Sequence, residues 1–254
     1  EVDIKIKFKL EEIIITLNMS VKEKIFMARV ADQAERYDDM VEFLKEVIDT
    51  KGEDLNTEER NLLSVGFKNL ISASRSAWRT VGAIEQNDKY SEYASDCSSY
   101  KKKISEELDA QCKKVIEIVK DKCLPKAADD EAKTFYLKMI GDYYRYIAEN
   151  ATGDMLEEAT KGALDYYEQA TQAGKELKPY NSTKLGLALN YSVFYYEVKS
   201  DIPKACSLAE EALENAKQNI DNMDNEDARD ALSIVELLKE NLSLWKDEEN
   251  EGNE

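Results

Sequence analysis

Apolar residues recur every three or four positions along most of the chain, the spacing that places them on one face of an α-helix. The first helix is expected to run from a capping box at Ser20 and Glu23 to about residue 34. Eight more are predicted at roughly 38–50, 57–87, 91–122, 131–149, 154–176, 183–199, 203–219 and 227–245. Asn56 with Glu59 gives a second start signal. Because the predicted connections are short, neighbouring helices should be mostly antiparallel.

The first 18 residues follow a different pattern. Val2, Ile4, Ile6 and Phe8 alternate with charged residues, which is a strand signal, but a single strand before a helical body has no obvious partner. We therefore expect residues 1–18 to form an N-terminal arm that is flexible or not native; a short edge strand at a contact is the alternative. A single all-helical domain is expected over 19–246, followed by an acidic, disordered tail at 247–254.

Composition supports a helical protein and excludes several functions. The chain has 9 Gly and 3 Pro in 254 residues, too few turn residues for a β-sandwich or barrel. Its net charge of −18 disfavours nucleic acid and anionic membranes as partners. No run of 18 apolar residues predicts a membrane span.

The chain contains no histidine, which excludes Ser-His-Asp and Cys-His catalysis and every zinc site that needs imidazole. The four cysteines include no CxxC pair and are expected to be reduced thiols of an intracellular protein. We therefore predict a protein that is not an enzyme, with no catalytic residue, metal site or cofactor. An enzyme that uses paired carboxylates is disfavoured because no catalytic motif singles out one pair among 53 acidic residues.

Basic residues form two helical stripes against the acidic background. Lys68 and Arg75 lie seven residues apart on one predicted helix, and Lys138 and Arg145 repeat that spacing on another, with Tyr146 adjacent. Guanidinium groups bind phosphate oxygens in pairs, and a phenol adds a donor. These side chains could surround a dianion. The alternative is that the cations simply pair with the surplus carboxylates.

Two predicted helices carry an asparagine at the edge of an apolar face. Asn190 accompanies Leu185, Leu189 and Val193, and the helix at 227–245 holds Asn241 with Ile234, Leu237, Leu238 and Leu244. An amide donates and accepts, so an exposed asparagine can hold the backbone of an extended peptide. Ordinary helix packing with an asparagine at its rim is the alternative interpretation.

Five sequence blocks resemble the 14-3-3 family, in family order and with near-family spacing from about residue 19 to 246. They are AERYDDM at 34–40, ERNLLSV at 59–65, FYLKM and GDYYRY within 135–146, LGLALN and FYYE within 185–197, and NLSLW at 241–245. The resemblance implies an all-α, cup-shaped protomer of nine helices that binds phosphoserine or phosphothreonine segments of client proteins in an amphipathic groove.

Site residues follow from the resemblance by position. The phosphate pocket would consist of Lys68, Arg75, Arg145 and Tyr146. The peptide-backbone and groove residues would be Lys138, Leu189, Asn190, Val193, Glu197, Ile234, Leu237, Asn241, Leu244 and Trp245. The resemblance also implies an adaptor in the cytoplasm, with the nucleus as a second compartment.

Dimerisation is a further implication of the resemblance, with the first four helices forming the interface. A homodimer is expected, and a heterodimer with a paralogue is the alternative. The interface residues would be Val30, Ala34, Arg36, Asp39, Ala77, Tyr100, Lys103 and Glu107. Arg36 would pair with Glu107 across the interface, and Asp39 with Lys103. Ala77 stands where several family members carry a phosphorylatable serine, so regulation at that position should be absent.

A different function remains open. The helices at 183–199 and 203–219 resemble a tetratricopeptide hairpin, although no strict 34-residue repeat is present. The alternative is therefore a helical-repeat scaffold that binds unphosphorylated peptides. The two hypotheses differ in whether affinity depends on a phosphate group.

Overall fold

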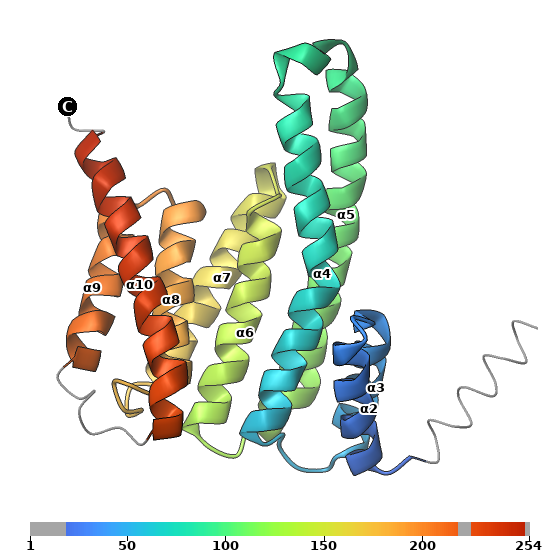
Figure 1. The fold of residues 1–254 in the computed structure, drawn as a ribbon, viewed down its shortest axis with the longest axis vertical. Coiled ribbons are helices and arrows are strands. Elements are labelled where there is room, and N and C mark those ends of the chain that lie inside the picture. The colour runs from blue at the N-terminus through green and yellow to red at the C-terminus, as the bar shows by residue number, and fades with distance from the viewer. Residues whose placement is uncertain (1–18, 218–224, 252–254) are drawn as a thin grey trace, which may run out of the picture. The chain divides into compact units, whose positions relative to one another are not determined.

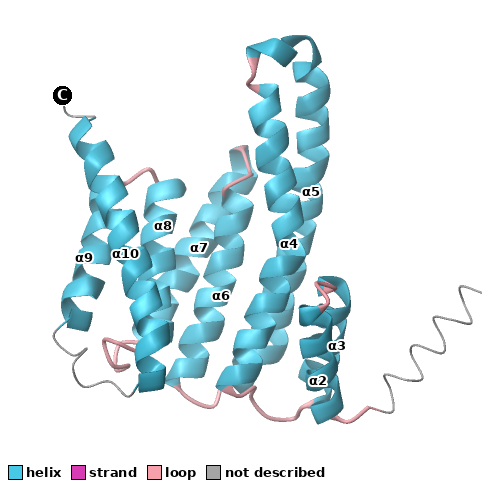
Figure 2. Cartoon of the chain, in the orientation of Figure 1, coloured by secondary structure: helices cyan, strands magenta, loops and turns pink. Residues whose placement is uncertain are grey.

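The computed structural model describes residues 19–217 and 225–251, and within these ranges the chain forms α-helices and no strands (Figures 1 and 2). The nine α-helices described are α2 (Val21–Gln33), α3 (Tyr37–Thr50), α4 (Thr57–Glu85), α5 (Ala94–Ile118), α6 (Asp130–Ala148), α7 (Gly153–Ala173), α8 (Ser182–Glu197), α9 (Ile202–Lys217) and α10 (Asn225–Glu251). The all-α prediction is confirmed. The alternating segment at 1–18 lies outside the described residues.

The capping box predicted at Ser20 and Glu23 is formed, and the predicted start at Asn56 and Glu59 is a capping box as well. The Ser20 hydroxyl accepts the Glu23 amide at 3.3 Å, while the Glu23 carboxylate accepts the Ser20 amide at 2.7 Å. Asn56 and Glu59 exchange the same pair of bonds, each at 2.9 Å. Each box satisfies amides that a helix start would otherwise leave unpaired, so these motifs fix where α2 and α4 begin.

The predicted helix at 91–122 is interrupted at both ends. A 3₁₀ segment, Asp88–Tyr93, precedes α5, and a π-helical turn, Val119–Cys123, follows it. A 3₁₀ turn, Leu124–Lys126, then contains Pro125. Proline has no amide hydrogen and its ring collides with the preceding helical turn, so the regular helix ends before it.

The predicted boundary of the acidic tail is wrong, because α10 continues as a helix to Glu251. Adding a residue to an existing helix costs far less free energy than starting one, and glutamate is a good helix former. The Tyr196 hydroxyl of α8 also donates to Glu248, which fastens this extension. Residues 252–254 lie outside the described part.

The described chain consists of two compact units that divide between Leu108 and Asp109, within α5. The N-terminal unit holds α2, α3, α4 and the start of α5. Its core is built from large apolar side chains of α3 and α4, among them Met40, Leu44, Leu63, Phe67 and Ile71. A Cβ on Gly66 would lie 3.1 Å from Leu44, so glycine permits close packing of these two helices.

The C-terminal unit contains α6 to α10, which run in alternating directions (Figure 1). One buried cluster contains Leu137, Tyr167, Tyr191 and Phe194 from α6, α7 and α8. A second cluster joins α8 to α9 and α10 and contains Leu185, Ala205, Cys206, Ala209, Leu213, Ala216, Ala231, Val235, Leu238 and Trp245. Helix α8 is therefore held from two sides.

Among the described residues, every helix is too short or too polar to pass through a lipid bilayer.

Candidate functional site

Helix α6 carries charged side chains into the interior of the C-terminal unit. Arg145 is 5% exposed and Asp142 is 6% exposed, although charged groups are costly to remove from water unless they are paired. Both residues lie on the face that also carries Lys138, because Lys138 is four residues before Asp142 and Arg145 is three residues after it. One face of α6 therefore carries all three charged side chains.

The Arg145 guanidinium has partners on three helices. Its Nη1 donates to Glu149 at 2.7 Å and lies 3.6 Å from the Glu197 carboxylate, and its Nε donates to the Tyr167 hydroxyl at 3.2 Å. The guanidinium also lies over the Tyr146 ring, 4.6 Å from its centroid. Burial by itself would lower the pKa of Arg145, but Tyr167, Tyr146 and the carboxylates raise it well above its usual value. Arg145 is therefore a fixed cation with a defined orientation.

Asp142 connects the same three helices. Its Oδ2 accepts a bond from the Lys138 ammonium at 2.9 Å, and its Oδ1 accepts from the Tyr167 hydroxyl at 2.7 Å and from Asn190 Nδ2 at 2.8 Å. Burial, followed by the nearby Asp142 carboxylate, raises the pKa of the Tyr167 phenol well above its usual value. Tyr167 therefore stays protonated and can donate.

The absence of a side chain at Gly141 of α6 leaves room for the Tyr167 ring of α7. A Cβ at this position would lie 2.9 Å from the tyrosine ring, closer than packed atoms approach. The Tyr167 ring also stacks on Tyr191 of α8, with ring centroids 5.1 Å apart. The ring is completely buried, so the phenol has little freedom to turn away from Asp142.

The structure brings together five of the predicted site residues. Lys138, Arg145, Tyr146, Asn190 and Glu197 are linked within the C-terminal unit by the contacts described above. The pairing of these cations with carboxylates, named above as the alternative interpretation, is present here, and their binding of a dianion stays a prediction.

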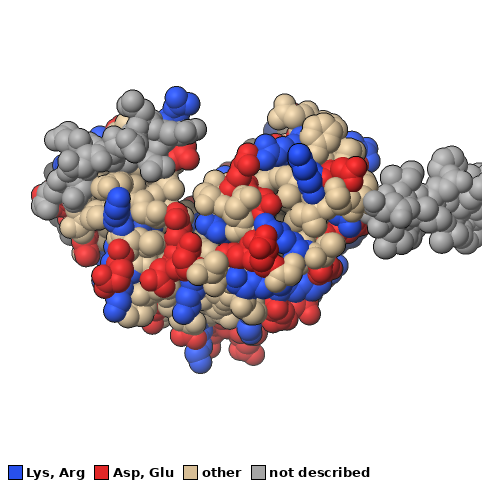
Figure 3. Space-filling model, turned by 90° about the horizontal axis from the view of Figure 1, so that it is seen from below, with Lys and Arg blue, Asp and Glu red and all other residues tan. Residues whose placement is uncertain are grey.

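Lys68 and Arg75 lie on α4 in the N-terminal unit, where Lys68 is exposed and Arg75 is half-buried. Their convergence with Arg145 and Tyr146 on one phosphate stays a prediction. On the surface shown in Figure 3, acidic and basic side chains are interspersed.

The apolar residues predicted for the groove differ in exposure. Leu237 is 46% and Leu244 is 66% exposed on α10, so both can meet a ligand. Leu189, Val193 and Ile234 are partly buried against the cluster between α8, α9 and α10. Asn241 is half-buried.

Trp245, which was predicted to lie at the groove, is largely buried, and its contact with a peptide stays a prediction. Its indole is 4% exposed and stacks on Tyr196, with ring centroids 5.1 Å apart. The ring belongs to the buried cluster because its large apolar area is more stable inside the core than in water. Trp245 therefore supports α10 from within.

The predicted interface residues lie in the N-terminal unit. Val30 is 41% and Tyr100 is 56% exposed, while Ala34 is exposed and Ala77 is half-buried. Phe26 is 64% exposed on the same helix as Val30, and sequence reasoning did not single it out. An exposed phenylalanine next to an exposed valine on one helix is a signal of a contact surface.

The predicted interface charges have partners within the chain. Arg36 donates to Asp39, and the Lys103 ammonium lies 3.9 Å from the Glu107 carboxylate. All four side chains are well exposed, so these pairs contribute little stability and can exchange partners.

Sequence reasoning also missed Asp142 and Tyr167. Asp142 lies four residues after Lys138 and three before Arg145, so an acidic residue between two candidate cations was the available signal. Tyr167 had no such signal, because its role depends on how α7 packs on α6.

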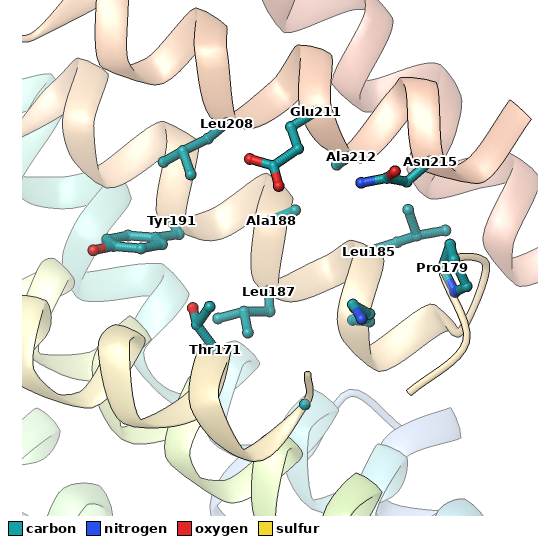
Figure 4. Close-up of a pocket in the computed structure, with 12 residues that line it drawn as sticks. Thr171, Pro179, Leu185, Leu187, Ala188, Tyr191, Leu208, Glu211, Ala212 and Asn215 are labelled. Carbon is teal, nitrogen blue, oxygen red and sulfur yellow. The ribbon is translucent and has the colours of Figure 1, made fainter. Parts of the chain in front are cut away.

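The described residues contain no cluster of three His, Cys, Asp or Glu side chains suited to a metal ion. They do contain a cavity of about 170 Å³ between α7, α8 and α9 (Figure 4). Figure 4 shows Leu187, Tyr191, Leu208 and Glu211 around it. None of the predicted site residues lines this cavity; two of its lining residues contact Tyr167, Tyr191 by ring stacking and Thr171 through a hydrogen bond to the Tyr167 carbonyl.

Comparison with known proteins gives consistent matches. Residues 27–246 match the family model described as 14-3-3 protein. The chain is 43% identical over 241 residues to 14-3-3 protein beta/alpha-A of Xenopus laevis, which covers 93% of this chain and 97% of that protein. It is 41% identical over 241 residues to 14-3-3 protein zeta of Bombyx mori, covering 94% and 97%. It is 42% identical over 229 residues to 14-3-3 protein 5 of Solanum lycopersicum, covering 88% and 90%.

Proposed function

Because the chain belongs to the 14-3-3 family, whose members are adaptors and not enzymes, we propose that it binds phosphoserine or phosphothreonine segments of client proteins as a dimer and thereby regulates them. The observation that carries this proposal is the oriented, permanently charged guanidinium of Arg145. A guanidinium fork matches the spacing of phosphate oxygens, and one that is already fixed loses little conformational entropy on binding.

Glu197 marks the side from which a phosphate would approach. Its carboxylate is 37% exposed and lies 3.6 Å from Arg145 Nη1, farther than a hydrogen bond. Glu149, at 2.7 Å, is 11% exposed and holds the guanidinium from the interior. A phosphate dianion would therefore compete with Glu197 for Arg145, while Glu149 keeps the side chain in place.

Local charge explains why further cations are needed. Lys138 and Arg145 face three carboxylates, those of Asp142, Glu149 and Glu197. A phosphate adds a charge of about −1.5 to −2, which this set alone does not balance. We propose that Lys68 and Arg75 of α4 supply the balance and that the Tyr146 hydroxyl donates to the same phosphate, as the family pattern implies.

The remainder of the peptide would lie along α8 and α10. Asn190 and Asn241 offer amides to its backbone, and the exposed Leu237 and Leu244 offer apolar contacts to its side chains. The contacts to the peptide backbone are independent of its sequence, so the phosphate would give most of the specificity.

The titration that tests the proposal compares one peptide with and without its phosphate. A fluorescently labelled peptide containing arginine and one phosphoserine should bind at least about 100-fold more tightly than its unphosphorylated form, because only the phosphorylated form brings a dianion to the proposed set of cations. Fluorescence anisotropy at fixed salt measures both affinities. Equal affinities would instead support the helical-repeat scaffold.

The dimer is tested by native mass spectrometry. We propose that Phe26, Val30 and Tyr100 pack against a second copy of the chain. The wild type should appear at twice the mass of one chain, and Phe26→Asp with Tyr100→Asp should appear as a monomer, because buried carboxylates without partners oppose association. Met155→Asp on α7, where the side chain is 40% exposed, is the matched control and should remain dimeric. A monomeric wild type would refute the proposed dimer.

A further inference from the structure

We propose that Asp142 is a positioning residue that orients the Asn190 amide toward the peptide backbone and, through Tyr167, orients Arg145 toward the phosphate. This inference rests on the proposed function and goes beyond the residues that touch the ligand. Asp142 itself is 6% exposed, so it acts through the side chains around it.

The Asn190 amide has two distinguishable ends, and Asp142 selects which end faces outward. Asn190 Nδ2 donates to Asp142 Oδ1 at 2.8 Å. If the amide turned over, its oxygen would meet the carboxylate oxygen at that distance, and two acceptors repel each other. The Asn190 oxygen therefore faces away from Asp142 and can accept a backbone N–H of the peptide.

The same carboxylate oxygen also fixes the phenol. Asp142 Oδ1 accepts the Tyr167 hydroxyl at 2.7 Å, which leaves the lone pairs of the phenol oxygen for Arg145 Nε at 3.2 Å. Since the Tyr167 ring is completely buried and packs against Gly141 and Tyr191, the hydroxyl cannot move far. One buried oxygen thus sets the directions of both a peptide-binding amide and a phosphate-binding guanidinium.

Whether removal of the Asp142 carboxylate raises or lowers phosphopeptide affinity distinguishes a positioning role from a purely electrostatic one. The Asp142 carboxylate lies 4.0 Å from Arg145 Nη2 and carries the same charge as the ligand. If Asp142 acted only as a charge, its removal would strengthen binding of a phosphopeptide. If it acts by positioning, its removal weakens binding even though a repulsive charge is lost.

A double-mutant cycle in the full chain tests the inference. Asp142→Ala, Asn190→Ala and the double variant are titrated with the same phosphoserine peptide, with Glu157→Gln, an exposed carboxylate of α7, as the charge control. Asp142→Ala should weaken binding by about tenfold when Asn190 is present, and by less than about threefold when Asn190 is already alanine. Asp142→Asn keeps an oxygen in place of Oδ1 and should recover most of the loss.

Tighter binding by Asp142→Ala, an equal loss of affinity on Asp142→Ala with and without Asn190, or no recovery of affinity by Asp142→Asn would each overturn the inference.

Circular dichroism shows whether each variant is folded. Should Asp142→Ala be unfolded, the ligand-free wild type supplies the decisive measurement by NMR. One side-chain amide proton of Asn190 must then be protected from exchange, and unprotected protons would reject the inference. If the wild type binds the phosphorylated and unphosphorylated peptides equally, the proposed function is refuted, and this outcome is distinct from those that overturn the role of Asp142.

Discussion

Replacing Arg145 by alanine should weaken binding of a phosphoserine peptide by about 2–5 kcal/mol, which corresponds to a loss of affinity between about 30-fold and about 5,000-fold. The dianion would meet three carboxylates, those of Asp142, Glu149 and Glu197, without the guanidinium that now lies among them. Affinity for the unphosphorylated peptide should change much less, since that peptide brings no dianion. Fluorescence anisotropy with the two peptides measures this difference.

A lysine at the same position makes the experiment more informative. Arg145→Ala also leaves buried carboxylates without their partner, so the fold itself will lose stability. Arg145→Lys keeps the charge but lacks the fork that reaches Tyr167 and Glu149 together, so it should bind with intermediate affinity. Lys161→Ala, an exposed cation of α7, is the control for loss of charge. Unchanged phosphopeptide affinity in a folded Arg145→Ala protein would refute the site.

Replacing Trp245 by alanine should lower the free energy of unfolding by about 3–5 kcal/mol, the usual cost of deleting a large aromatic side chain from a core. The indole is part of the cluster that holds α10 on α8 and α9, and it stacks on Tyr196 with an angle of 24° between the rings. Its removal leaves a cavity in the buried cluster that joins α10 to α8 and α9. Urea denaturation measures the loss.

The effect should be concentrated in α10. Hydrogen exchange in the Trp245→Ala protein should be faster for α10 amides than for α6 amides, because α6 has its own buried contacts with α7. Trp245→Phe keeps a ring on Tyr196 and should lose less stability. Exchange that accelerates equally in both helices would contradict this local role. Peptide affinity should fall as well, since α10 carries Leu237, Asn241 and Leu244.

The helices could be predicted from the sequence because their signals are local. Ser20 with Glu23 and Asn56 with Glu59 define two starts, and the spacing of apolar residues defines the faces of the helices. The end of α10 could not be predicted, since the acidic composition of 247–251 indicated disorder while the contact with Tyr196 depends on folding. The composition of a short segment cannot indicate the hydrogen bond between Tyr196 and Glu248, which are 52 residues apart in the sequence.

The candidate site was predicted in part for the same reason. The seven-residue spacing of Lys138 and Arg145 placed both cations on one face of α6, which the structure confirms. Spacing could not indicate which carboxylates would approach them, because Glu197 comes from α8 and Tyr167 from α7. The burial of Trp245 is another property that only tertiary packing decides.

The fastening of α8 from two sides has a consequence for the ligands that this surface can accept. Leu187 and Phe194 anchor α8 in one buried cluster and Leu185 anchors it in the other, while Asn190 is bonded to α6. A surface held in this way cannot reshape itself around a folded partner. The loss of conformational entropy on binding then falls on the peptide, which must become extended. Segments that are unstructured before they bind can adopt that shape without breaking other contacts, so the sites recognised in clients should be loops and tails and not helices or strands.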